Sequence, residues 1–239
     1  MAIVGTSTTA DAGRSQYGWL YGTEVIPERG AEIQTWVAEK NGRTDDDLKE
    51  TSLWWGALVG VTDQLELAFP VEFVWLRPDG VSPRPPATFS LEKFGVEARY
   101  RFVSQDPEDA PPFAPLLRVG VKRDISVRDA VRAEADLVMS YEAGRFHGLV
   151  DLGAIADIGK DETHVELRPG AGVSIKVTDE LRVGGEVYSE ISMDDEYESW
   201  AAVGPNLAWT HGRFWLSASY LVGVYQIDNA PRIVWGVLF

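Results

Sequence analysis

Residues 64–76 are the stretch that decides the fold, and they read Gln64-Leu65-Glu66-Leu67-Ala68-Phe69-Pro70-Val71-Glu72-Phe73-Val74-Trp75-Leu76. Large apolar side chains occupy every odd position from Leu65 to Trp75, whereas the two glutamates fall on even positions. Strict alternation of this kind is typical of a β-strand with one apolar and one polar face. The stretch therefore predicts a strand that separates an apolar environment from a polar one.

The same alternation recurs along the chain. From residue 30 onward, segments of about ten residues are separated by polar or turn-forming clusters, and helical spacing is nearly absent. Such segments are expected near residues 30–39, 51–61, 64–76, 88–103, 113–122, 130–142, 146–157, 163–177, 181–192, 199–209, 213–225 and 231–239. The pattern predicts an all-β chain with an even number of strands.

The links between these segments alternate in length. Tight links occur at Thr62-Asp63, Ala143-Gly144-Arg145, Thr178-Asp179-Glu180 and Thr210-His211-Gly212, whereas links such as 41–50 and 77–87 are long and polar. Short turns at one end and long loops at the other are typical of an outer-membrane barrel. The link 104–112 is long where a short turn is expected. Pro70, Pro169 and Pro205 fall inside predicted strands and also count against the prediction unless bulges absorb them.

Composition narrows the classes further. The 239 residues carry a net charge of −15, 45% of them are apolar, and none is cysteine. Charges interrupt every apolar run before the roughly 18 residues that a membrane-spanning helix needs. The acidity argues against a nucleic-acid partner, and the lack of cysteine excludes disulfides and thiolate metal sites.

A soluble β-sandwich would show the same alternation, but two features favour a membrane barrel. The segments reach the roughly 9–11 residues that cross a bilayer, and aromatic residues lie near the ends of the apolar faces. We therefore predict an all-β fold, a transmembrane antiparallel up-and-down β-barrel with 12 strands.

The N-terminal region is interpreted separately. Residues 1–12 are read as the remnant of an export signal, because Ala10-Asp11-Ala12 matches a small-x-small cleavage site. A disordered N-terminus is the alternative. Residues 13–239 then form a single barrel domain, in which 13–29 lead in and 30–239 carry the strands.

Two motifs resemble known families. The final segment, with Ile233, Trp235, Val237 and the terminal Phe239 at alternate positions, resembles the C-terminal signature of bacterial outer-membrane proteins. That resemblance implies recognition by the outer-membrane assembly machinery.

The hairpin Gly60-Val61-Thr62-Asp63-Gln64-Leu65-Glu66-Leu67 resembles one found in the transporter / MetA-pathway of phenol degradation type family, and 177–183 repeat it loosely. Residues 21–32 resemble the same family's lead into its first strand. The resemblance implies a barrel in the outer membrane of a Gram-negative bacterium, in contact with the lipid bilayer and lipopolysaccharide, and passage of a small solute.

Strand parity predicts which charged side chains face the lumen. The candidates for setting selectivity are Arg99, Arg101, Arg118, Lys122, Arg132, Arg168, Lys176, Arg182, Glu66, Glu97, Glu134 and Glu186. Because the luminal charges are close to balance, they could line a narrow polar path or bridge across it. The leading hypothesis is a narrow passive channel without a cofactor or metal.

Two alternatives stay open. The first is a closed structural or surface-recognition barrel that acts through the acidic loop tips Asp45-Asp46-Asp47, Lys160-Asp161-Glu162 and Asp194-Asp195-Glu196, which could bind divalent cations. The second is an outer-membrane lipid hydrolase, because Ser140 is expected to lie opposite His147, with Asp151 further along the same strand. Parity places this pair inside the barrel, whereas such a hydrolase needs its nucleophile on the lipid-facing wall.

Overall fold

The computed structural model describes residues 15–42, 48–78, 88–106, 108–127, 129–194 and 198–239. The predicted export-signal remnant at 1–12 and the acidic residues Asp45-Asp46-Asp47 and Asp195-Glu196 lie outside the described residues. Within these ranges, no helix has the length and apolar character needed to cross a membrane.

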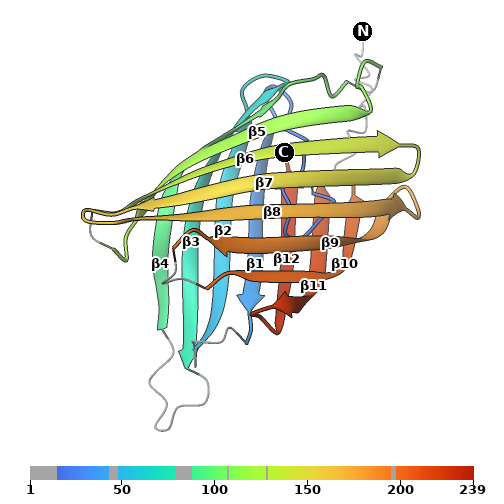
Figure 1. The fold of residues 1–239 in the computed structure, drawn as a ribbon. Helices are drawn as coiled ribbons and strands as arrows, with labels where there is room; N and C mark the ends of the chain where they lie inside the picture. Colours follow the sequence, from blue (N-terminus) through green and yellow to red (C-terminus); the bar gives the residue numbers. More distant parts are fainter. Residues whose placement is uncertain (1–14, 43–47, 79–87, 107, 128, 195–197) are drawn as a thin grey trace.

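The described residues form a closed antiparallel barrel of twelve strands (Figure 1). The strands are β1 (Ala31–Lys40), β2 (Leu48–Gly60), β3 (Leu65–Pro78), β4 (Thr88–Arg101), β5 (Phe113–Asp124), β6 (Val131–Ala143), β7 (Phe146–Ile158), β8 (Thr163–Lys176), β9 (Leu181–Ser192), β10 (Trp200–His211), β11 (Phe214–Tyr225) and β12 (Asn229–Leu238). Each strand pairs with its neighbours in sequence, and β1 pairs with β12 to close the barrel. The predicted strand number, and every predicted boundary to within three residues, is confirmed.

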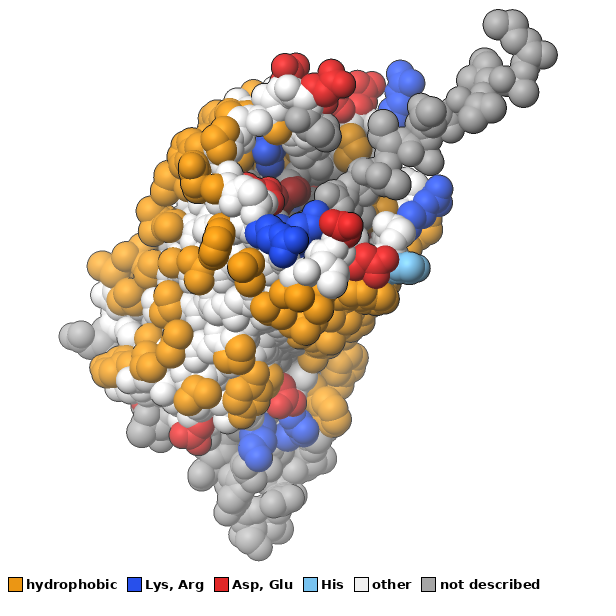
Figure 2. All heavy atoms as spheres, turned by 90° about the vertical axis from the view of Figure 1, so that its right-hand side faces the viewer, with side chains coloured by type: hydrophobic (Ala, Val, Ile, Leu, Met, Phe, Trp, Pro, Cys, Tyr) orange, Lys and Arg blue, Asp and Glu red, His pale blue; other side chains and the backbone are white. Residues whose placement is uncertain are grey.

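The outer wall is apolar, as parity predicts. Phe69, Trp75 and Val203 are 46%, 43% and 46% exposed, whereas Glu66 and Glu97 on the opposite faces are buried. Figure 2 shows hydrophobic side chains spread over much of the visible surface, with charged side chains at the top, near the centre and at the lower edge of the view. An apolar outer face of this kind suits a hydrocarbon environment.

The three prolines lie where the ladder is interrupted on one side. Pro70 pairs with Gly56 of β2 but has no partner on β4, Pro169 has none on β9, and Pro205 has none on β11. Because proline has no N–H to donate, each occupies a position where that donor is not used. The prolines are therefore compatible with the barrel.

The interior holds a segment that the sequence did not predict there. Residues 15–26, expected only to lead into the first strand, lie within the barrel, and the exposed residues 27–29 connect them to β1; we call residues 15–30 the plug. It enters and leaves at the short-turn end, where Ser217 contacts Ser15 and the main chain of Glu28 bonds Asp63 in the β2–β3 turn. Its tip, residues 19–21, lies toward the long-loop end. There the indole N–H of Trp19 donates to the carbonyl oxygen of Ala230, 3.0 Å away.

Apolar residues of the plug and wall pack into a core inside the lumen. Tyr17, Trp19 and Leu20 are buried in one cluster with wall residues that include Leu116, Val138, Leu149, Tyr188, Trp200 and Leu221. Wall glycines make room for the plug, since a Cβ at Gly172 would lie 2.4 Å from Tyr17 Cε1. The lumen therefore holds an apolar core between plug and wall in addition to the charged side chains that parity indicates.

Candidate functional site in the lumen

Wall carboxylates hold the main chain of the plug. Glu186 on β9 accepts hydrogen bonds from Gly18 N (3.0 Å) and Trp19 N (3.1 Å). Asp151 on β7 accepts one from Tyr21 N (3.0 Å), and Glu66 on β3 accepts one from Ile26 N (2.7 Å). Hydrogen bonds to ionised groups are stronger than neutral ones, so these carboxylates satisfy plug N–H groups that would otherwise be buried without partners.

The returning arm of the plug is held by the β4–β5 link. The side chain of Gln105 both accepts from Val25 N (3.3 Å) and donates to Val25 O (2.9 Å). Arg101 Nη1, at the end of β4, donates to Thr23 O over 2.8 Å. The link 104–112, unexpectedly long for the short-turn end, therefore supplies a contact to the plug.

The residues considered for hydrolysis also serve the plug. Ser140 lies opposite Leu149, and His147 lies opposite Glu142, so the expected pairing of Ser140 with His147 is wrong. Ser140 Oγ lies 2.6 Å from Thr23 Oγ1, and His147 Nδ1 lies 3.0 Å from Tyr17 Oη. Burial raises the pKa of the Tyr17 hydroxyl above its usual range, so Tyr17 stays protonated beside the imidazole.

A compact charge cluster surrounds the tip of the plug. Arg118 on β5 is fully buried and bonds Glu97 (2.7 and 3.0 Å), Glu134 (2.5 Å) and Asp136 (2.5 Å). Its guanidinium also lies 4.2 Å from the centre of the Tyr21 ring, a cation–π contact. Arg118, Glu97 and Glu134 therefore lie inside the barrel, as parity predicts, and they are bonded to one another.

Lys122 and Arg99 extend this network. Lys122 Nζ lies 2.6 Å from Glu72, 2.9 Å from Glu134 and 3.2 Å from Glu97. Arg99 lies 3.4 Å from Glu66 and 3.5 Å from Glu97.

The other predicted luminal cations lie apart from this cluster. Arg132 pairs with Asp157, Lys176 lies 3.7 Å from Asp179 at the short-turn end, and Arg182 lies 3.4 Å from Glu142. Arg168 lines the cavity described next. The predicted residues thus divide between a buried network, the two ends of the lumen and the plug contacts.

A chamber of about 300 Å³ lies beyond the tip of the plug, toward the long-loop end. Its floor includes Trp19 and Tyr21 of the plug, and aromatic wall residues such as Trp36 and Tyr188 face it. Among the described residues, its lining carries ten carboxylates and five lysine or arginine side chains, namely Glu50, Glu72, Glu92, Glu134, Asp136, Asp151, Asp157, Glu166, Glu190, Glu198, Lys40, Lys122, Arg132, Arg168 and Arg232. The chamber is therefore acidic, and the plug separates it from the short-turn end.

The described part of the chain holds no group of three or more histidine, aspartate and glutamate residues arranged to bind a metal ion. In one of the acidic loop tips, a carboxylate oxygen of Asp194 lies 2.7 Å from Nδ1 of His164. In another, Asp161 and Glu162 are exposed.

The predicted assembly residues form the strand that closes the barrel. Ile233, Trp235 and Val237 pair with Val37, Thr35 and Ile33 of β1, and Phe239 N donates to Ala31 O over 2.9 Å. Their recognition by the assembly machinery stays a prediction.

Sequence reasoning missed the plug itself. A signal was present in Tyr17-Gly18-Trp19-Leu20-Tyr21, an aromatic run ahead of the first strand. Aromatic side chains of this size are usually buried. Inside a barrel, the lumen is the place where a segment ahead of the first strand can bury them.

Comparison with known proteins gives the fold. No family model and no curated protein matches the sequence. Among solved structures, the COG4313 outer membrane channel from Pseudomonas putida F1 is similar over 91% of this chain and 98% of its own, with a TM-score of 0.66 and 9% identity.

Two further barrels are also similar. The β domain of the Bordetella autotransporter BrkA has a TM-score of 0.55 and 11% identity, covering 88% of this chain and 99% of its own. The NanC porin has a TM-score of 0.53 and 12% identity, covering 86% and 98%. The chain therefore has the fold of bacterial outer-membrane β-barrels, in agreement with the predicted location, and the resemblance to the COG4313 channel is one of structure at low sequence identity.

Proposed function

We propose that this barrel is a narrow passive channel for a small solute, closed at rest by the plug. The observation that carries the proposal is the acidic chamber of about 300 Å³, which ends on the plug residues Trp19 and Tyr21. A purely structural barrel has no need for a chamber of this size lined by charged groups. The structural similarity of this chain to a protein described as an outer membrane channel supports the proposal.

The mechanism follows from the contacts of the plug. A solute enters the chamber from the long-loop end and meets the tip of the plug as a floor. Passage requires the tip to leave the wall, which breaks the main-chain bonds to Glu186 and Asp151. No energy source is needed, since the solute moves down its own gradient through a fixed electrostatic field.

A reversible lock tests the proposal. Thr23 and Ser140 are buried and their hydroxyl oxygens lie 2.6 Å apart, and sulfur atoms at these positions would need to approach to about 2.05 Å to form a disulfide. Because the chain has no cysteine, Thr23→Cys/Ser140→Cys would form one defined cross-link between plug and wall. We expect little current across a planar bilayer when the pair is oxidised, and wild-type current after reduction.

The control is Ala133→Cys/Ala156→Cys, a cross-strand pair of β6 and β7 on the outer wall. Its oxidation should leave the current unchanged. Equal current from the oxidised and reduced lock would show that the plug does not gate passage. No current from folded protein in any state would instead favour the closed structural or surface-recognition barrel, which also predicts partner binding through the acidic loops.

A further inference from the structure

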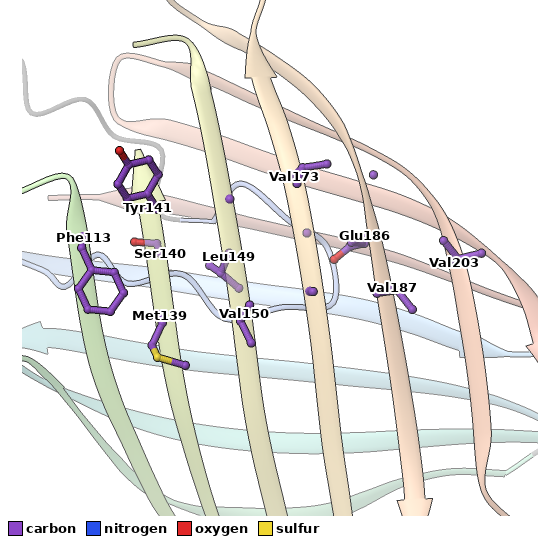
Figure 3. Close-up of a pocket in the computed structure, with 14 residues that line it drawn as sticks. Phe113, Met139, Ser140, Tyr141, Leu149, Val150, Val173, Glu186, Val187 and Val203 are labelled. Atoms are coloured by element: carbon purple, nitrogen blue, oxygen red, sulfur yellow. The ribbon is translucent and has the colours of Figure 1, made fainter. Parts of the chain in front are cut away.

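Among the described residues, the outer wall carries an apolar groove. The groove, of about 700 Å³, crosses the outer face from β5 to β10 (Figure 3). In this view Phe113 and Tyr141 stand at one end and Val203 at the other, with Val150, Val173 and Val187 between them. The hollow is open toward the outside, so an occupant would be covered by the protein on one side only.

The groove exists because small residues replace large ones on the outer face. Gly148 on β7, Ala171 on β8 and Gly185 on β9 lie in its floor. A Cβ at Gly148 would meet nothing within 4 Å, and one at Gly185 would meet only the carbonyl oxygen of Gly204, at 3.4 Å. The backbone at these positions would therefore accept a side chain, and the space is unfilled by the protein.

Apart from the Tyr141 hydroxyl at one end, the groove offers no polar side chain to an occupant. The other two polar lining residues belong to the interior, since the Ser140 hydroxyl contacts Thr23 and the Glu186 carboxylate accepts from Gly18 N and Trp19 N. The flanking Val173 and Tyr141 are 66% and 55% exposed. An occupant must therefore be apolar.

The position of the groove indicates the orientation of its occupant. Phe113 and Tyr141 face each other across β5 and β6 at the short-turn end, where aromatic residues of barrels meet the membrane interface. From this pair the groove runs into the apolar wall. A chain that has its polar end at the interface and its apolar end in the membrane fits this arrangement.

We propose that the groove binds one acyl chain of a membrane lipid, whose headgroup lies near Phe113 and Tyr141. Lipid tails are as apolar as the wall, so the gain comes from close packing in a hollow that would otherwise lose van der Waals contacts. A second copy of this chain is a poorer occupant, because a two-fold interface places the same surface on both partners and would set one hollow against another. The site is independent of whether the barrel conducts.

Filling the groove tests the proposal. Gly148→Leu/Gly185→Leu places two side chains in the hollow, and Ala135→Leu on β6 is the control, because Ala135 is exposed outside the lining of the groove. The probe is dimyristoyl phosphatidylethanolamine added to folded protein in detergent micelles. Native mass spectrometry should show one retained lipid on the wild type and on Ala135→Leu, and at least tenfold weaker retention on the double variant.

Added lipid should also raise the melting temperature of the wild type and of Ala135→Leu, with a smaller rise for the filled variant. Should the double variant fail to fold, Ala171→Leu fills the middle of the same groove with one substitution. Equal lipid retention by wild type and filled variants would overturn the proposal. It would also be overturned by a mass of two protomers in the wild type that the filled variants lose, because the groove would then be an interface between copies.

Discussion

Arg118 shows how individual charges are tolerated inside the barrel. Its guanidinium is fully buried and makes four hydrogen bonds to three carboxylates. Parity along β5 was enough to place this side chain in the lumen. It could not show which carboxylates reach it, because those partners come from β4 and β6 and depend on barrel register.

Replacing Arg118 by methionine should reduce the free energy of unfolding by about 3–5 kcal/mol, because buried Asp136 would lose the cation that bonds it and Glu97 and Glu134 would keep only Lys122 and Arg99. Arg123→Met is the matched control, since Arg123 lies on the same strand and forms a 3.6 Å pair with Asp129 in which the side-chain exposures are 41% and 66%. A pair this exposed contributes about 1 kcal/mol or less. Denaturant titration of both variants in detergent micelles measures the difference, and similar losses would contradict the assignment of Arg118 as the centre of the network.

The plug is the element on which the proposed function depends. Strand positions could be predicted because alternation has a period of two residues and repeats along each strand. The plug has no such period, and its main-chain bonds to Glu186, Asp151 and Glu66 do not depend on its own side chains. From the sequence alone, carboxylates that bind the plug therefore cannot be distinguished from carboxylates that line an open channel.

Glu186→Ala should loosen the tip of the plug, because it removes both bonds to Gly18 N and Trp19 N. Hydrogen bonds to charged groups contribute about 1.5–3 kcal/mol each, so the open probability in single-channel records should rise by about tenfold or more. Glu142→Ala is the control, since Glu142 is exposed and contacts Arg182, not the plug. Unchanged open probability in Glu186→Ala would indicate that the other anchors alone hold the plug.

At the scale of the whole molecule, the chamber is the acidic space that ends on the plug. Its ten carboxylates outnumber its five lysine and arginine side chains among the described residues. Parity indicated near balance for the lumen as a whole, whereas in the chamber carboxylates predominate because Arg99 and Arg118 are not among the residues that line it.

We expect an open channel to prefer potassium over chloride, which the reversal potential in a KCl gradient measures. Glu166→Gln should weaken this preference and Arg168→Gln should strengthen it, since both residues line the chamber two positions apart on β8. The preference should fall as salt rises from 0.1 M to 1 M, because the Debye length shrinks from about 10 Å to about 3 Å. Shifts of the same sign in the two variants would contradict the electrostatic origin.

The plug and the wall that binds it belong to one chain, and β1 begins directly after the plug at Ala31. A released tip therefore remains tethered at an effective concentration of about millimolar or more. Any solute crossing the barrel competes with this tethered ligand for the same space. Dwell times in the open state should consequently be independent of how many barrels a membrane contains and should lengthen as solute concentration rises, which is the behaviour of a competitive binding equilibrium within a single molecule.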